Sequence, residues 1–382
     1  MKYQLENPFP EYGYFGPEYF CDREQETERL ISALRNGSNV TLMAPRRIGK
    51  TGLIHHAFQR LRQQQPEAQC FYVDVFPTKN FTQMVQLLAE TVIGKLDTRS
   101  QSLKRRINAF MASLRPTMSL DKLDGMPTMS FNIVPEQAKE TLATVFEYMK
   151  LSERPCYLAI DEFQQVATYA EYGVDAYIRS VIQLIPNVRI VFSGSQQHLL
   201  AEMFMSPKHP FFNSTQMMAI DVIPQDKYRA FANDFFARQQ RAVSEADFGF
   251  LYQLVDGQTW YIQKVLNRLF RYPKRPIDHA LVVEAIDTIL LEQEINYQNS
   301  YSLLTENQAL LLTAIAKEGS VKAPTALDFV MRYRLPAPSS IKTALKSLID
   351  KEMLFQAPSG EYIVYDRFFG LWLRRLYSTR NF

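Results

Sequence analysis

The segment that most constrains this chain runs from Val40 to Ile54 and reads VTLMAPRRIGKTGLI. An apolar run of strand length leads into a loop of the form A-x-x-x-x-G-K-T, and a helical pattern leaves it. The usual phosphate-binding loop reads G-x-x-x-x-G-K-[ST], so only Ala44 departs from it, where the first glycine would stand. Such loops hold anions with backbone N–H groups and a helix N-terminus, and the glycine nearest the phosphates, Gly49, is retained. We therefore expect phosphate binding; the alternative is a chance strand, turn and helix with a lysine.

The residue types in this loop predict specific roles in binding ATP and Mg²⁺. Lys50 is expected to reach the β- and γ-phosphates, and Thr51 to offer its hydroxyl to Mg²⁺. Backbone N–H groups from Ile48 to Gly52 would surround the phosphate oxygens. The candidate nucleotide-binding residues of the loop are Ala44, Arg47, Ile48, Gly49, Lys50, Thr51 and Gly52.

Polar residues follow two further apolar runs. The run CYLAIDEF ends in Asp161 and Glu162, and a parallel sheet would bring its carboxyl end beside the loop. Asp161 is then expected to bind Mg²⁺, and Glu162 to orient and deprotonate the attacking water; the alternative for such a pair is a helix cap. The run VRIVFSGS offers a hydroxyl at Ser193 or Ser195 to the γ-phosphate or the water, and Ser193 is the catalytic candidate. The alternative for these serines is a helix N-cap.

The pattern along the 382 residues predicts two or three domains. Short apolar runs separated by helical patterns over residues 1–223 indicate an α/β domain with a largely parallel sheet. Alternating segments around Asp124-Gly125 predict a β-hairpin inserted at about 117–134. Residues 224–300 read as a small helical domain. Residues 301–382 give a helix, a loop, a helix and two short strands around Ser359-Gly360, the order of a winged helix.

Composition excludes several classes of protein. The longest apolar runs, such as CYLAI, fall far below the roughly 20 residues of a membrane-spanning helix, so we expect no membrane insertion. The N-terminal sequence lacks the pattern of a secretion signal, which predicts a cytoplasmic protein. Three cysteines without C-x-x-C spacing argue against disulfides and zinc. The net charge of +3 is small, although residues 301–382 hold 11 Lys and Arg against 7 Asp and Glu.

With these motifs assembled, the chain resembles the prokaryotic archaeal-type ATPases of the AAA+ class, in the branch related to the STAND ATPases. The resemblance rests on YFCDREQETERL, APRRIGKT, YLAIDEFQ, IVFSGS and YDRFFGLWLRR. It implies a P-loop parallel-sheet domain, then a helical lid domain and a winged-helix domain. It also implies that the segment YFCDREQETERL lies over the adenine; a plain helix start is the alternative. The candidates there are Phe20, Cys21, Asp22 and Arg23.

The chain departs from this family at one place with consequences for the rate of hydrolysis. Many relatives carry an aromatic-Gly-Arg element after the fourth strand, whose arginine acts on the γ-phosphate. This chain has Asn213 and Ser214 there. Hydrolysis is therefore expected to be slow, or to use Arg46, Arg47 or an arginine of a partner. The alternative for the two loop arginines is a structural role, pairing with nearby carboxylates.

Three functional hypotheses follow. The first is a molecular switch in which ATP or ADP controls the arrangement of the lid and winged-helix domains. The second is a DNA-binding regulator whose winged helix is the working part, and the third is a nucleotide binder without turnover. A protein partner or self-association is compatible with each. The residues that would contact DNA are Ser339, Ser340, Lys342, Thr343 and Lys346, with Arg374 and Arg375 nearby.

Overall fold

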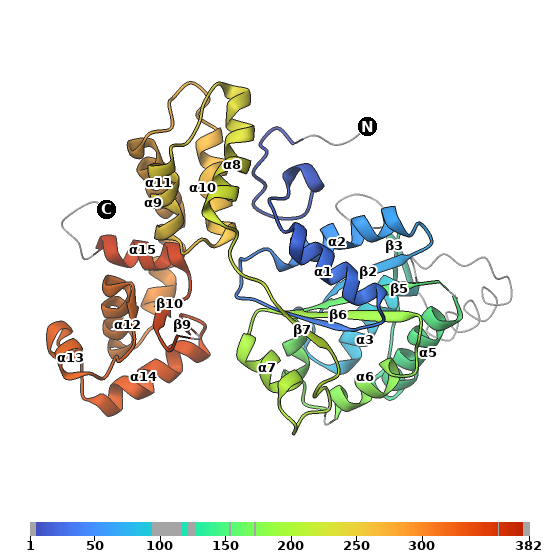
Figure 1. Cartoon of the computed structure of the whole chain (residues 1–382). Helices are drawn as coiled ribbons and strands as arrows, with labels where there is room; N and C mark the ends of the chain where they lie inside the picture. Colours follow the sequence, from blue (N-terminus) through green and yellow to red (C-terminus); the bar gives the residue numbers. More distant parts are fainter. Residues whose placement is uncertain are drawn as a thin grey trace. The chain divides into compact units, whose positions relative to one another are not determined.

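The computed structural model describes residues 5–93, 117–120, 127–152, 154–171, 173–357 and 359–376 (Figure 1). The chain forms two compact units. The sheet unit comprises Tyr12–Val222, and the helical unit comprises Met1–Glu11 together with Ile223–Phe382. Within the described residues, no helix combines the length and the apolar character needed to cross a membrane.

A five-stranded sheet forms the centre of the sheet unit, and every strand pair in it is parallel. The strand order is β2-β5-β6-β1-β7. This arrangement confirms the predicted α/β fold with a parallel sheet, and it places β6 between β1 and β5. The strands are β1 (Val40–Met43), β2 (Gln69–Asp74), β5 (Cys156–Asp161), β6 (Val188–Gly194) and β7 (Gln216–Ala219).

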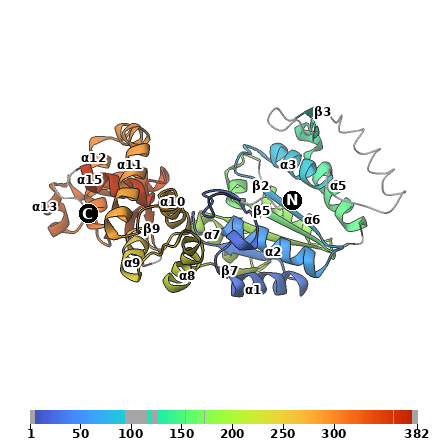
Figure 2. The ribbon, with the colours of Figure 1, turned by 90° about the horizontal axis from the view of Figure 1, so that it is seen from above.

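Helices cover both faces of this sheet, and alternate residues of each central strand enter two different cores. On β5, Tyr157 and Ala159 join the core beneath α1 and α2, whereas Leu158 and Ile160 join the core beneath α3, α5 and α6. Figure 2 shows the two groups of helices on opposite sides of the sheet. The helices are η1 (Pro17–Tyr19), α1 (Glu24–Arg35), α2 (Lys50–Gln64), α3 (Phe81–Ile93), η2 (Pro135–Gln137), α5 (Ala138–Leu151), η3 (Phe163–Thr168), α6 (Val174–Ile182) and α7 (Gln197–Met205).

A separate antiparallel pair lies within the segment where a hairpin is predicted. Strands β3 (Thr117–Leu120) and β4 (Pro127–Ser130) pair with Thr117 opposite Ser130. The predicted Asp124-Gly125 turn lies outside the described residues.

The helical unit contains a group of helices followed by a winged helix. The winged helix begins at α12, where Thr305 and Gln308 form a capping box, and its three-stranded sheet has the order β8-β10-β9. The predicted winged helix is thus confirmed, with two more helices, α13 and α15, and one more strand, β8, than its sequence pattern indicates. The elements are α8 (Gln225–Phe236), η4 (Ala237–Gln239), α9 (Glu245–Leu254), α10 (Thr259–Phe270), α11 (His279–Ser302), α12 (Glu306–Glu318), β8 (Ser320–Val321), α13 (Leu327–Tyr333), α14 (Pro338–Asp350), β9 (Leu354–Gln356), β10 (Tyr362–Val364) and α15 (Arg367–Leu376).

Aromatic residues join the winged helix to the helices that precede it. Tyr261 of α10 is fully buried, and its ring meets that of Phe368 edge-on with 4.8 Å between centroids. The Arg367 backbone N–H donates to the Tyr261 hydroxyl at 2.9 Å. Residues 224–300 and 301–382 therefore share one compact unit, and the boundary between them as separate domains stays a prediction.

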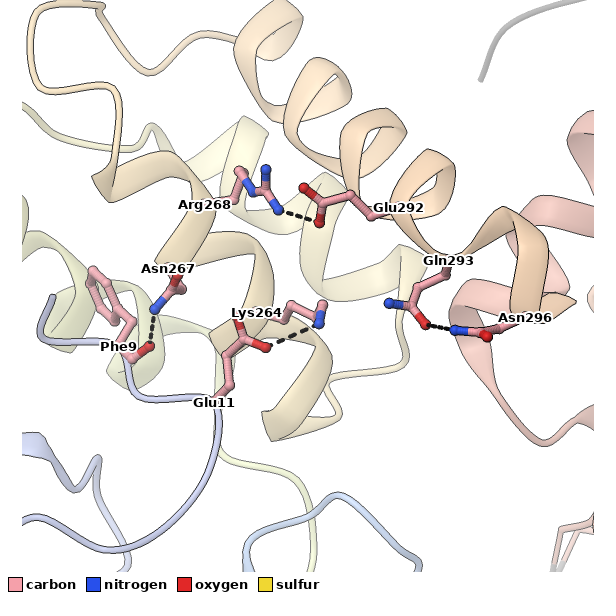
Figure 3. A network of polar contacts seen from close by, with 8 residues as sticks. All are labelled: Phe9, Glu11, Lys264, Asn267, Arg268, Glu292, Gln293 and Asn296. Atoms are coloured by element: carbon pink, nitrogen blue, oxygen red, sulfur yellow. Dashed lines mark hydrogen bonds and ion pairs between the residues drawn. The ribbon is translucent and has the colours of Figure 1, made fainter. Parts of the chain in front are cut away.

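The N-terminal segment, residues 5–11, belongs to the helical unit. Phe9 is completely buried, and Asn267 of α10 donates from Nδ2 to the Phe9 carbonyl at 2.7 Å. Lys264, one turn earlier on α10, pairs with Glu11 at 3.0 Å (Figure 3). The rings around Phe9 belong to Phe231, Phe235, Phe236 and Phe270. The aromatic, Pro-rich start of the chain is thus a structural anchor.

Candidate nucleotide-binding site

The loop between β1 and α2 contains two residues with left-handed backbones, although it lacks the first glycine of the usual pattern. Gly49 adopts φ 99° and caps α2, and Arg47 also has a left-handed φ, of 68°. Ala44 lies outside the left-handed region and is completely buried in the core beneath α1 and α2. Position 44 thus requires a small side chain and not a positive φ, which an alanine satisfies.

Lys50, the first residue of α2, is held at the mouth of the loop. Its Nζ donates to the carbonyls of Ala44 and Pro45 at 2.9 and 3.0 Å. Burial lowers the pKa of Lys50 to about 8, against the opposing influence of the Glu162 and Asp161 carboxylates. The two carbonyls that accept from this buried ammonium are neutral. An incoming phosphate would supply a negative charge that stabilises the ammonium.

The acidic pair lies at the same edge of the sheet as Lys50. Thr51 Oγ1 donates to Asp161 Oδ2 at 2.9 Å, and the backbone N–H of Glu162 donates to Asp161 Oδ1 at 3.0 Å. This arrangement follows from topology, since β1 and β5 are parallel to the intervening β6 and end at one edge. The structure therefore brings Lys50, Thr51, Asp161 and Glu162 together, as the sequence analysis expects.

Glu162 is fixed by residues from two other segments. Its backbone is left-handed, with φ 54°. Its Oε2 accepts from Ser195 Oγ at 2.7 Å and from Gln164 Nε2, and Arg46 Nε donates to Ser195 Oγ at 3.2 Å. Ser195 is the first residue after β6, so it links the acid to the phosphate loop.

Ser193 lies in a different environment from Ser195. It sits within β6 and is completely buried, and among the described residues its hydroxyl has no hydrogen-bond partner. The structure thus assigns the observed contact with Glu162 to Ser195, and a catalytic role of Ser193 stays a prediction. Gln164 also contacts Glu162; sequence reasoning gave it no role, although it is the last residue of the segment YLAIDEFQ.

The segment expected over the adenine braces the loop. The Phe20 ring stacks on His56 of α2 with 4.5 Å between centroids, and a Cβ added at Gly52 would lie 3.1 Å from this ring. Arg23 is buried, donates to the Ile48 carbonyl at 3.2 Å and pairs with Glu26 at 2.8 Å. Asp22 and Arg23 both have left-handed backbones, and Cys21 is buried. Contacts of these residues with a base stay a prediction.

Tyr72 of β2 is a second residue that sequence reasoning missed. Its hydroxyl donates to Asp161 Oδ2 at 2.7 Å, and its ring contacts the His55 ring of α2 with 4.6 Å between centroids. Burial, reinforced by the Asp161 charge, raises the pKa of Tyr72 above its ordinary value, so the phenol stays protonated as a donor. A hydroxyl within the apolar strand CFYVDV is the only sequence signal for it.

The chemistry of Thr51 and Asp161 fits Mg²⁺. The described residues contain no cluster of three or more His, Cys, Asp and Glu side chains placed to hold a metal ion. Mg²⁺ in nucleotide sites commonly takes only one or two protein oxygens, with water and phosphate oxygens completing its shell. One hydroxyl and one carboxylate, 2.9 Å apart at the loop, are such a set.

Solved structures with a similar fold cover nearly the whole chain. The Walker-type ATPase PABY2304 of Pyrococcus abyssi has a TM-score of 0.64 at 16% identity, over 96% of this chain and 99% of that chain. The ADP form of the ORC2 protein of Aeropyrum pernix has a TM-score of 0.53 at 14% identity, over 94% and 93%. The A. pernix ORC1 protein in complex with DNA has 0.53 at 12% identity, over 97% and 96%. At such identities the likeness concerns the fold.

Family relationships rest on the sequence itself. Residues 295–375 match a probable winged helix domain, and residues 20–265 match the family described as an ATPase domain predominantly from Archaea. No curated protein matches the chain in sequence. The ATPase match spans more than half of the residues and includes both the loop and the acidic pair. This chain therefore belongs to the archaeal-type ATPase family, as an ATP-hydrolysing P-loop enzyme with a C-terminal winged helix.

Proposed function

We propose that this ATPase is a nucleotide-controlled switch, in which the nucleotide in the sheet unit sets the arrangement of the helical unit and its winged helix. The observation that carries the proposal is the path of the chain, which passes between the units at Glu11–Tyr12 and again at Val222–Ile223. The first passage is anchored at both ends, by Phe9 in the helical unit and by Arg23 on the Ile48 carbonyl of the phosphate loop. A shift of the phosphate loop on nucleotide binding would thus act on the passage at Glu11–Tyr12, in addition to the passage at Val222–Ile223.

The chemistry proposed for the site uses the residues around the loop. Lys50 and the N–H groups from Ile48 to Gly52 bind the phosphates, and Thr51 and Asp161 hold Mg²⁺, which neutralises phosphate charge. Glu162 orients and deprotonates the attacking water, and Ser195 keeps its carboxylate in place.

X-ray scattering of the Glu162→Gln variant tests the switch, because this variant is designed to hold ATP without turnover. The radius of gyration with ATP and Mg²⁺ is expected to differ from that with ADP, since only differential contacts with the two nucleotides can shift the arrangement. The double variant that also carries Lys50→Ala controls for nucleotide effects outside the site. Identical scattering with ATP and ADP would refute the switch.

Replacing Phe9 by alanine is expected to release the N-terminal segment from the helical unit. Truncating a buried Phe removes its contacts with four surrounding rings and costs enough binding energy to raise the detached fraction at least about tenfold. Cleavage within residues 5–22 by chymotrypsin at low concentration should accelerate by a similar factor, because such cleavage follows the open population.

A matched control is Glu11→Gln in the same segment. It removes only the ion pair with Lys264, whose side chains are partly exposed, so its cleavage rate should change less than that of Phe9→Ala. If the Phe9→Ala variant is cleaved at the wild-type rate, the anchoring role of Phe9 is wrong. If the variant is cleaved faster but keeps the full ATP-dependent change in scattering, the N-terminal segment does not transmit the nucleotide state to the helical unit.

A second candidate function is DNA binding through the winged helix. Helix α14 buries Ile341, Ala344 and Leu348 and exposes Lys342 and Lys346 on its other side. The similar fold of ORC1, which is solved in complex with DNA, supports this candidate.

The two C-terminal arginines are already engaged within the helical unit. Arg374 donates to the Ala316 carbonyl, and Arg375 pairs with Asp287 at 3.0 Å. The proposed DNA contact therefore centres on α14, with Ser339, Ser340, Lys342, Thr343 and Lys346.

The double variant Lys342→Ala, Lys346→Ala is expected to weaken binding to random duplex DNA in a fluorescence anisotropy titration. If both lysines contact phosphates, the slope of log affinity against log salt should fall by about 2. The double variant Lys274→Ala, Lys317→Ala of the same unit is the control for general loss of charge. Absence of wild-type binding at low salt would eliminate this candidate, while leaving the ATPase unaffected.

A further inference from the structure

The carboxylate of Asp161 is fixed by donors from three directions. Its Oδ2 accepts from Thr51 Oγ1 at 2.9 Å and from the Tyr72 hydroxyl at 2.7 Å, and its Oδ1 accepts from the Glu162 backbone N–H at 3.0 Å. Asp161 is also buried. Thr51 and Glu162 belong to the loop and the acidic pair already described, whereas Tyr72 comes from β2, a strand that supplies neither.

Strand register explains how Tyr72 reaches this carboxylate. Tyr72 lies opposite Ala159 on β5, and Asp161 lies two residues further along the same strand. Residues two apart in a strand share a face, and this face is the one covered by α2, since Ala159 and Tyr72 both pack in that core. The Tyr72 side chain therefore extends along the sheet beneath α2 towards the carboxyl edge, supported by the His55 ring.

We propose that Tyr72 is a positioning residue of the metal site, which holds the Asp161 carboxylate in the orientation that binds Mg²⁺ with the nucleotide. The inference rests on the proposed binding of Mg²⁺ by Thr51 and Asp161. A carboxylate held only by Thr51 and its own strand end could rotate about its χ2 bond, and the hydroxyl of Tyr72 removes this freedom at Oδ2. Outer partners of this kind orient metal ligands and commonly change metal affinity about 10- to 100-fold when removed.

Calorimetric titration of Tyr72→Phe tests this role without relying on turnover. ATP binding is measured at increasing Mg²⁺ concentrations, and ADP binding is measured in EDTA. The Mg²⁺ concentration for half-maximal enhancement of ATP binding is expected to rise about tenfold or more. Affinity for ADP in EDTA should stay within about twofold of wild type, because the Lys50 and backbone contacts do not involve Tyr72. A melting curve confirms that the variant is folded.

Tyr157→Phe is a matched control from the adjacent strand. Tyr157 is a buried tyrosine on the same face of the sheet, but its hydroxyl donates to Gln65 Oε1 at 2.9 Å and not to Asp161. Its loss should leave the Mg²⁺ requirement unchanged.

Three results would overturn the proposal, and they differ in what else they refute. An unchanged Mg²⁺ requirement in Tyr72→Phe refutes the role of Tyr72 alone. An equal loss of ADP affinity in EDTA indicates a merely structural role and also refutes it. If ATP binding by the wild type does not respond to Mg²⁺, the metal site of Thr51 and Asp161 is refuted together with the role of Tyr72.

Discussion

Lys50→Ala is expected to weaken ATP binding at least about 100-fold, because it removes the ammonium group that the start of α2 places against the phosphate loop. A hydrogen bond to a charged group is worth about 1.5–3 kcal/mol, and several phosphate oxygens are within reach of one ammonium. Equilibrium binding of a fluorescent ATP analogue measures the loss. The exposed Lys79→Ala in the same unit is the control and should bind normally.

The same lysine predicts a pH dependence. Burial lowers the pKa of Lys50 from 10.5 to about 8, so below pH 8 the side chain is protonated in both the folded and the unfolded chain, and the cost of burying the charge is fully present. Between pH 8 and 10.5 the folded state loses this proton first, so the contribution of Lys50 to the free energy of unfolding increases with pH. The difference in unfolding free energy between wild type and Lys50→Ala should therefore rise across this window, by up to about 3 kcal/mol. ATP affinity should fall above pH 8, because the neutral amine binds phosphate less well. If the Lys50→Ala variant binds ATP with wild-type affinity, the assignment of this loop as the phosphate-binding loop is wrong.

Glu162→Gln is expected to reduce ATP turnover about 10²- to 10⁴-fold, the range that general base catalysis contributes. The amide keeps the shape of the side chain and can still pair with Ser195, but it cannot take a proton from water. ATP affinity should remain near that of wild type, since the contacts of Lys50 and Thr51 do not depend on Glu162. Phosphate release at saturating ATP, with binding measured in parallel, separates the two quantities.

Glu67→Gln, on the surface of the sheet unit, is the control for this substitution. Equal turnover in wild type and Glu162→Gln would refute the role of Glu162 as the general base. The baseline rate of the wild type is itself expected to be low, because Asn213 and Ser214 occupy the place of the family's arginine. A rise in specific turnover with protein concentration would support an arginine supplied by self-association.

Sequence analysis predicted those parts of the site whose residues lie close together in the chain and follow a known motif. The strand before the phosphate loop, the loop itself and the start of the helix after it lie within fifteen consecutive residues, Val40 to Ile54. The acidic pair also follows directly from one apolar run. Their proximity could be expected because parallel strands end at a common edge, and the strand order places β6 between them.

The parts that could not be predicted depend on pairing across the sheet or on side-chain direction. Tyr72 reaches Asp161 only because β2 pairs with β5 in one particular register. Ser195 and not Ser193 touches Glu162 because the strand has ended by residue 195, where the chain turns towards the acid. Phe9 gave no periodic pattern, since a seven-residue anchor is too short to show one.

Ala44 has a consequence for how this family is recognised. Its backbone lies outside the left-handed region and its methyl group is buried in the core, so position 44 of this chain needs a small side chain and not the conformational freedom of glycine. Other small side chains should serve equally well there, whereas Gly49, with φ 99°, is far less replaceable. A pattern search that requires the leading glycine therefore passes over this chain, whereas a definition built on Gly49, Lys50 and Thr51 retains it.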